Sequence, residues 1–169
     1  MKILITGVAG TGKSTISKAL NDKGIFSVDF GDVPNLCTWR NKTTKKDVPN
    51  LPITDPTWYD DHERVCDMEK LKEILNQHED IVITGAVGSS IDHLPLFDKV
   101  ILLQCRPETF THRMETRTRP YGKEKAERDD TIQWQKHFDP KLLTYGAIPV
   151  STEGSLEETI ERLISKIKQ

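Results

Sequence analysis

A glycine-rich run near the start of the chain has the composition and spacing of a phosphate-binding loop. It fits the pattern G-x-x-x-x-G-K-[ST], and its residues, with the threonine that follows, are Gly7, Val8, Ala9, Gly10, Thr11, Gly12, Lys13, Ser14 and Thr15. Glycines let the backbone approach a ligand closely, so that successive N–H groups converge on an anion. The lysine supplies a positive charge to phosphates and the serine hydroxyl binds Mg²⁺. The run therefore predicts a site for ATP or a close relative, with Mg²⁺.

The segments on either side of this run are those that must hold a phosphate loop in place. Residues 2–6 are a short apolar, β-branched run, as in a buried parallel strand. Residues 13–23 have apolar side chains at helical spacing and end before Gly24. A strand, a glycine loop and a helix in this order are the context that the motif requires.

Further along the chain, apolar runs and helical patterns alternate. Residues 25–29, 81–84, 100–103 and 147–150 have the length of buried strands. Helices are predicted over 59–77, from Pro107 onward, and over 156–168 after a capping box made by Ser155 and Glu158. This alternation predicts an α/β fold of the three-layer P-loop NTPase type, with a five-stranded parallel sheet and helices on both faces. Ligands then bind at the carboxyl ends of the strands.

Two stretches interrupt the alternation. Residues 33–57 are polar and proline-rich, whereas 116–130 are dense in charge and contain Gly122; the prolines of the first stretch are Pro34, Pro49, Pro52 and Pro56. Irregular segments of this length inside a compact domain are usually functional, often as lids over a site. At 169 residues the chain has the length of one domain.

Composition excludes several other classes of protein. The formal net charge is −2 and charges of both signs are mixed along the chain, which argues against general binding of DNA or RNA. No apolar run approaches the roughly 20 residues that cross a bilayer, and no apolar signal core begins the chain. Cys37, Cys66 and Cys105 are widely spaced, which predicts free thiols. We expect a soluble cytoplasmic protein, either a monomer or a simple homodimer, with no membrane partner.

The residues that follow the strand corresponding to 81–84 differ between classes of phosphate-loop proteins. Motor and AAA-type ATPases place an acidic Mg²⁺ ligand there, whereas residues 85–89 read GAVGS and contain no acid. A GTPase would need an N-K-x-D motif, and the nearest string, NKTT at 41–44, lacks the aspartate. The pattern therefore disfavours a dedicated hydrolase and a GTPase.

Four landmarks make the chain resemble the adenylate-kinase-like superfamily, which includes adenylate kinases, atypical adenylate kinase, shikimate kinase and gluconate kinase. The loop GVAGTGKST at 7–15 is followed by a helix, and SVDFGD at 27–32 is similar to the acidic end of their second strand. The third landmark is the lid: RMETRTRP at 113–120 is similar to its opening, and RDDTIQ at 128–133 is similar to its closing segment. TEGS at 152–155 lies where this superfamily passes the adenine ring.

The resemblance implies a phosphotransferase that moves the γ-phosphate of Mg-ATP to a small acceptor, either a nucleoside or nucleotide or a small hydroxylated metabolite. It implies one domain over 1–169, with an acceptor-binding insertion at about 33–64 and a lid at about 116–130. Catalysis in such enzymes is positioning plus neutralisation of charge on the transferring group. Arginines of the lid and the lysine of the phosphate loop would supply that charge.

Roles for individual residues follow from the same resemblance. Arg117 and Arg119 would act with Lys13 on the phosphates. Asp32 would orient the acceptor and take its proton, and Asp29 would hold Mg²⁺ with Ser14, unless the two aspartates exchange these roles. The other candidates are Arg113, Thr152 and Gly154 for the nucleotide and Arg40, Arg64 and Arg128 for the acceptor, near the aromatic residues Trp39, Trp58 and Tyr59.

Two other functions remain open at this point. The first is an ATP-hydrolysing switch that binds a protein or RNA partner, because P-loop folds host both behaviours. The second is a nucleotide-binding protein without turnover. This second alternative is disfavoured because Lys13, Ser14 and the arginines at 113–119 are all present.

Overall fold

The computed structural model describes residues 1–48, 55, 57–86 and 91–169. Pro49, Pro52 and Pro56 of the expected insertion lie outside the described residues, as do residues 87–89 of the GAVGS segment. Within the part that is described, no helix combines the length and the apolar character needed to cross a bilayer.

Five parallel strands form the central sheet. They are β1 (Lys2–Thr6), β2 (Ser27–Asp29), β6 (Ile81–Thr84), β7 (Lys99–Gln104) and β8 (Ile148–Ser151). The order across the sheet is β2-β6-β1-β7-β8, so β1, which leads into the glycine-rich loop, is the middle strand. In register, Ile3 lies beside Val82 on one side and Lys99 on the other. This confirms the predicted five-stranded parallel sheet.

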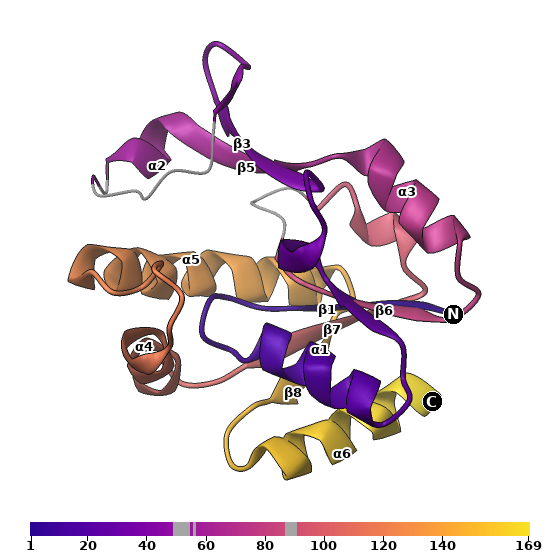
Figure 1. Cartoon of the computed structure of the whole chain (residues 1–169). Coiled ribbons are helices and arrows are strands. Elements are labelled where there is room, and N and C mark those ends of the chain that lie inside the picture. Colours follow the sequence, from indigo (N-terminus) through magenta and orange to yellow (C-terminus); the bar gives the residue numbers. More distant parts are fainter. Residues whose placement is uncertain (49–54, 56, 87–90) are drawn as a thin grey trace.

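Helices cover both faces of this sheet because successive side chains of each strand point in opposite directions. Ile3 and Ile5 of β1 belong to a buried cluster with residues of α1 (Lys13–Asp22) and α6 (Leu156–Lys168). Leu4 points the other way, into a cluster with residues of α3 (Met68–Asn76), α4 (Pro107–Thr116) and α5 (Lys125–Thr144). Figure 1 shows α1 and α6 below the sheet and α3 and α5 above it. The α/β class with three layers is confirmed.

The expected insertion contains a second, smaller sheet. Its strands are β3 (Cys37–Asn41), β4 (Asp47–Val48) and β5 (His62–Cys66), in the order β4-β3-β5, and both pairings are antiparallel. A one-turn helix, α2 (Trp58–Asp61), precedes β5, and the short 3-10 turn Phe30–Asp32 connects β2 to the chain that enters this sheet. In Figure 1 this sheet lies above the central one, at the end of the molecule where β2 and β6 finish. It therefore lies near the edge of the central sheet at which ligands are predicted to bind.

The prediction of one continuous helix over 59–77 is wrong for the part that forms β5, whereas Met68–Asn76 is helical as predicted. The structure divides this segment into α2, β5 and α3, because residues of β5 satisfy their backbone hydrogen bonds by pairing with β3. Hydrogen bonds at both ends of that ladder, from Lys42 N to Asp61 O and from Asp67 N to Leu36 O, are each 2.8 Å long. The Asp67 side chain then caps α3 by accepting a hydrogen bond from Lys70 N at 3.0 Å.

The charged stretch expected as irregular over 116–130 is partly helical. α4 ends at Thr116 and α5 begins at Lys125, so the irregular part extends only over 117–124. Glu124 and Glu127 form a reciprocal capping box at the start of α5, and Glu127 Oε2 also accepts a hydrogen bond from Gly122 N at 2.6 Å. The sequence patterns did not indicate α5, whose apolar side chains follow no clear helical stripe.

Candidate functional site

A large cavity lies at the carboxyl ends of the central strands. Its volume is about 1350 Å³. The parts of the chain that line it include the phosphate loop, the acidic turn after β2, the arginine-rich segment after α4, the loop after β8, and the antiparallel sheet of the insertion. The cavity therefore joins the regions predicted to bind a phosphate donor and its acceptor.

The phosphate loop takes the shape that its glycines allow. Gly10 and Gly12 have φ angles of 83° and 95°, in the left-handed region that favours glycine. A Cβ atom at Gly10 would lie 2.5 Å from the carbonyl oxygen of Phe110, so the loop packs against α4 at a point where only glycine fits. α1 begins at Lys13, directly after the loop, and the unpaired N–H groups of its first turn lie beside the cavity.

The Lys13 side chain folds back over the loop that precedes it. Its Nζ donates hydrogen bonds of 2.7 Å to the carbonyl oxygens of Gly7 and Val8. Burial lowers the pKa of Lys13 to about 8; Asp29 opposes this shift, whereas Arg117 and Arg119 add to it. A bound phosphate would relieve the repulsion among these three cations.

Two buried oxygen atoms near this lysine have no hydrogen-bond partner among the residues that the structure describes. Asp29 Oδ1 accepts a hydrogen bond from Gly31 N at 2.7 Å, but Oδ2 is buried and unpartnered. Thr84 Oγ1 is likewise buried without a partner, and Thr84 lies beside Asp29 in the register of β2 and β6. Because buried polar atoms are nearly always satisfied, these two oxygens indicate a place for water or a hydrated ion.

The donor set at this point fits Mg²⁺ bound together with a nucleotide. Ser14 and Asp29 both line the cavity. Mg²⁺ usually takes one or two protein carboxylates and completes its shell with waters and substrate phosphates. Consistent with this, the described residues include no group of three or more His, Cys, Asp or Glu side chains able to hold a metal by themselves. Asp32, at the end of the turn after β2, is exposed and also lines the cavity.

The arginines that follow α4 differ in their surroundings. Arg117 Nη2 donates to Tyr121 O at 2.6 Å, while Arg117 Nε is buried without a partner. Burial and, secondly, the charge of Arg119 lower the pKa of Arg117. Arg119 is exposed, and both arginines line the cavity. Arg128 does not line it: its Nη1 donates to the Gly122 carbonyl at 2.9 Å, which holds the irregular segment 117–124 to α5.

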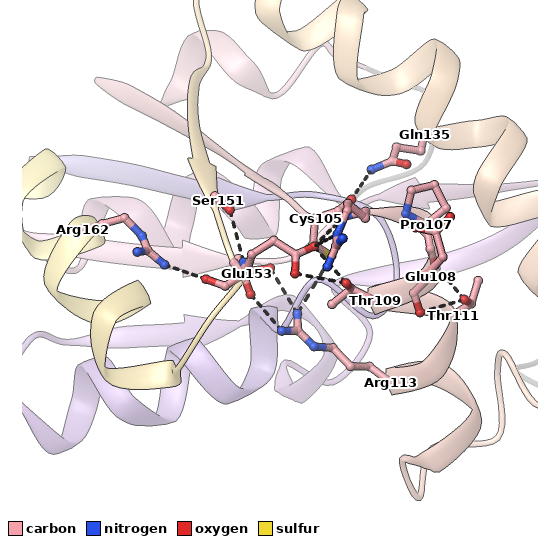
Figure 2. Close-up of polar contacts among 12 residues, drawn as sticks. Cys105, Pro107, Glu108, Thr109, Thr111, Arg113, Gln135, Ser151, Glu153 and Arg162 are labelled. Carbon is pink, nitrogen blue, oxygen red and sulfur yellow. Dashed lines mark hydrogen bonds and ion pairs between the residues drawn. The ribbon is translucent and has the colours of Figure 1, made fainter.

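Arg113 connects α4 to the loop after β8. Its guanidinium donates to the Thr152 carbonyl at 2.8 Å and to the Thr152 hydroxyl at 3.2 Å. The neighbouring Glu153 accepts hydrogen bonds from Arg106 N at 2.8 Å and from the Thr109 hydroxyl at 2.9 Å (Figure 2). These contacts fix the first turn of α4 against this loop, where Arg113, Thr152 and Gly154 reach the cavity. Glu153 is not among the residues predicted from the sequence, although a carboxylate suits a helix N-terminus.

Aromatic residues and one arginine of the insertion line the opposite side of the cavity. Trp39 and Arg64 are directly opposite each other on β3 and β5, and both reach the cavity. The rings of Trp39 and Tyr59 lie 5.6 Å apart, edge to face, and the buried Tyr59 hydroxyl has no hydrogen-bond partner in the described part of the chain. Arg40 does not line the cavity; it lies directly opposite Asp47 on β4, and its Nε pairs with Asp47 Oδ1 at 2.7 Å.

Some residues in or beside the cavity could not be identified from the sequence. Thr84 does not line the cavity but is buried next to Asp29, and only its unpartnered hydroxyl distinguishes it from other threonines at the end of an apolar strand. Tyr121, Asp130 and Trp134 reach the cavity from the irregular segment and from α5. The charge run in which Tyr121 and Asp130 lie gave no signal that distinguished these side chains from solvated ones.

The chain is similar in sequence and in fold to known proteins. The AAA_18 family model, described as an AAA domain, matches residues 3–134. A protein from Methanocaldococcus jannaschii named "Putative adenylate kinase" is 32% identical over 117 residues. That match covers 69% of this chain and 59% of the relative, so the chain matches less than two thirds of that protein's length.

Two solved structures have the same fold at low sequence identity. Deoxyadenosine kinase from M. mycoides with bound dATP has a TM-score of 0.60 and 19% identity, with full coverage of both chains. Shikimate kinase from Aquifex aeolicus has a TM-score of 0.56 and 18% identity, covering 99% of this chain and 96% of that one. The chain thus has the fold found in P-loop small-molecule kinases, and it belongs to the AAA_18 family of AAA domains.

Proposed function

We propose that the protein is an ATP-dependent phosphotransferase that transfers the γ-phosphate of Mg-ATP to a small acceptor. One observation carries this proposal: the phosphate loop, the arginines after α4 and the aromatic side of the insertion line the same cavity. A nucleotide bound at the loop would therefore point its terminal phosphate toward the insertion. The relative named as an adenylate kinase and the two kinases of similar fold support this interpretation.

In the proposed mechanism, this chain neutralises charge and aligns the reacting groups. Lys13 leaves the Gly7 and Val8 carbonyls to bind the phosphates, and Arg117 and Arg119 approach the transferring group from the lid. Positive groups placed in advance around a developing charge are the main source of rate enhancement in phosphoryl transfer. Ser14 and Asp29 would hold Mg²⁺, which would supply further positive charge to the phosphates.

The role of Asp32 depends on the acceptor. If the acceptor group is a hydroxyl, Asp32 is placed at the cavity wall where it can orient that hydroxyl and take its proton. If the acceptor is a phosphate, which has no proton to lose at neutral pH, Asp32 only helps to position it. Because Asp29 is buried beside Thr84 and Asp32 is exposed, we assign Asp29 to Mg²⁺ and Asp32 to the acceptor.

We propose nucleoside monophosphates as the first acceptor class to test. Arg64 can pair with a phosphate while Trp39 and Tyr59 contact a flat ring, and all three line the cavity. Small hydroxylated acids and sugars are the second class. A cytoplasmic location and a monomeric or simple dimeric state stay predictions.

A coupled assay of ADP release tests the proposal. The acceptors are nucleoside monophosphates, nucleosides, shikimate, gluconate and related polyols, each added with Mg-ATP, and Lys13→Ala is the blank. We expect one class to raise the rate above the blank, with phosphorylated product found by mass spectrometry. If no acceptor does so, and ATP hydrolysis instead responds to RNA or to a protein, the phosphotransferase proposal fails in favour of a switch.

A further inference from the structure

Two of the three cysteines lie directly opposite each other at the base of the insertion. In the antiparallel pairing of β3 and β5, Cys37 is the register partner of Cys66. The buried Cys37 belongs to the larger core cluster, and the partly exposed Cys66 packs against that cluster. Their side chains therefore point to the same face of the small sheet. They are 29 positions apart in the chain, so their spacing did not predict this contact.

The position of the pair within the ladder favours close approach of the sulfur atoms. Hydrogen bonds join Asp67 N to Leu36 O and Lys42 N to Asp61 O, so the pair between Cys37 and Cys66 falls at a position without such bonds. At these positions the Cα atoms of an antiparallel pair are only about 4.5 Å apart. Disulfides span Cα distances of about 4.4–6.8 Å, so a bond can form without separating the strands.

The surroundings of the pair favour a thiolate at Cys37. The neighbouring Cys66 thiol and the nearby Arg64 charge lower the pKa of Cys37 to about 7, although burial opposes the shift. The neighbouring Cys37, together with burial, raises the pKa of Cys66, whose Sγ lies 3.7 Å from the Asp67 carbonyl oxygen. Cys105 is as buried as Cys37, with 8% of each residue exposed, but burial raises the pKa of Cys105 and no cysteine pairs with it.

We propose that Cys37 and Cys66 form a redox-active dithiol that small peroxides oxidise to a disulfide. The Cys37 thiolate attacks the O–O bond of the peroxide, and Cys37 becomes a sulfenic acid as hydroxide leaves. The Cys66 sulfur then attacks the Cys37 sulfur and forms the S–S bond, with release of water. For hydrogen peroxide, the two thiols lose two electrons and two protons, and one peroxide becomes two waters.

The disulfide would tie together the strands that carry the acceptor side of the cavity. Trp39 follows Cys37 on β3, and Arg64 precedes Cys66 on β5. The bond closes the chain of the insertion into a loop and restricts motion between these strands. This inference concerns thiol chemistry and does not rest on the proposed phosphotransferase activity.

Intact mass spectrometry of the full chain tests the inference. The reduced protein is treated with hydrogen peroxide, excess peroxide is removed with catalase, and the mass is measured under denaturing conditions. We expect the loss of two hydrogen atoms per chain, full reversal by dithiothreitol, and a linked peptide containing Cys37 and Cys66 after proteolysis. Hydrogen exchange at β3 and β5 should slow on oxidation and stay unchanged at β1.

Single-cysteine variants identify the sulfur atoms. Cys105→Ser is the matched control and should lose two hydrogens like the parent. Cys66→Ser leaves Cys37 without its partner and should gain one oxygen, trapped by a sulfenic-acid reagent. The inference is overturned if the parent only gains oxygen atoms, keeps its reduced mass, or links Cys105. The peptide map of the parent protein shows which cysteines are linked, even if a variant does not fold.

Discussion

The two sides of the cavity are built in different ways. The donor side is one continuous segment, from Gly7 to Thr15, held between the middle strand β1 and the helix α1. The acceptor side brings together Trp39, Tyr59 and Arg64 from the insertion with Tyr121 from the segment after α4. The first is local in sequence and rests on a parallel sheet that helices cover on both faces, whereas the second depends on the pairing of a small antiparallel sheet.

The two sides of the cavity therefore differ in how many residue changes each can tolerate. A phosphate loop needs glycines at particular backbone angles and a lysine at one position, so few residue changes are compatible with its shape. The acceptor side can change its chemistry by replacing side chains on β3 and β5 without disturbing the central sheet. We therefore expect substitutions on the donor side to affect every acceptor alike, and those on the acceptor side to affect one acceptor class.

The largest expected effect comes from Lys13. Lys13→Ala should lower kcat/KM by about 10³-fold with every acceptor, because the group that binds the transferring phosphates is lost. The measurement is steady-state ADP release with two acceptors of different class, alongside thermal melting to check folding. A loss with only one acceptor would show that the donor side is not independent of the acceptor.

Arg64→Ala should have a smaller and more selective effect. We expect KM for a phosphate-bearing acceptor to rise about 10- to 100-fold, since a hydrogen bond to a charged group contributes about 1.5–3 kcal/mol, while KM for ATP stays unchanged. Arg40→Ala is the matched control, because Arg40 follows Trp39 on β3 and pairs with Asp47 outside the cavity. Equal effects of the two variants would contradict the placement of the acceptor beside Arg64.

Replacement of Asp32 separates the two acceptor classes. Asp32→Asn should lower kcat about 10²-fold or more if the acceptor group is a hydroxyl that must lose a proton. With a phosphate acceptor the loss should stay below about tenfold, because the residue then only positions the acceptor. Single-turnover rates for each class measure the difference, and an unchanged rate with a hydroxyl acceptor would remove Asp32 from the proposed mechanism.

The unpartnered hydroxyl groups on the two sides allow a matched pair of stability measurements. Tyr59→Phe and Thr84→Val each remove a buried hydroxyl that has no partner in the ligand-free protein. Each should stabilise the free protein by about 1 kcal/mol, which raises Tm by about 2–4 °C for a chain of this size. Tyr59→Phe should weaken acceptor binding alone, and Thr84→Val only binding of Mg-ATP. If Tyr59→Phe instead weakened binding of Mg-ATP and Thr84→Val weakened acceptor binding, the donor and acceptor sides of the cavity would have to be assigned the other way round.

The smallest expected effect is the uptake of a fraction of one proton when ATP binds. Because burial lowers the pKa of free Lys13 to about 8 and bound phosphate would raise it, ATP binding near pH 8 should take up protons. ATP affinity should accordingly fall as pH rises above about 8. Calorimetry in buffers of different ionisation enthalpy measures the uptake, and Lys13→Ala should abolish that pH-dependent part. Equal uptake in the variant would assign the proton to another group.

Prediction from the sequence succeeded where short-range patterns were sufficient. The strands Lys2–Thr6 and Ile81–Thr84 and the helix Leu156–Lys168 have the predicted bounds, because continuous apolar runs and a capping box mark them locally. It failed over 59–77, where helical spacing of apolar residues was compatible with a helix but pairing with β3 determined the outcome. Long-range pairing leaves little trace in a single sequence.

The contacts of individual side chains were likewise unpredictable where they depend on long-range strand pairing. Arg40 and Arg64 are both arginines in the same insertion, and only the strand register sends Arg64 to the cavity and Arg40 to Asp47. Cys37 and Cys66 have no sequence motif in common, yet β3 and β5 place them opposite each other. In each instance, the partner of a side chain is set by residues distant in the chain.

The sequence by itself determined the donor side, because a loop between a strand and a helix is specified by backbone angles and by residues within a few positions of one another. It also determined the α/β class, through the alternation of apolar runs. Only the tertiary structure decided which residues complete the cavity, which buried oxygens lack partners, and which cysteines meet. Those outcomes depend on strand register and helix packing, which arise from contacts between distant segments.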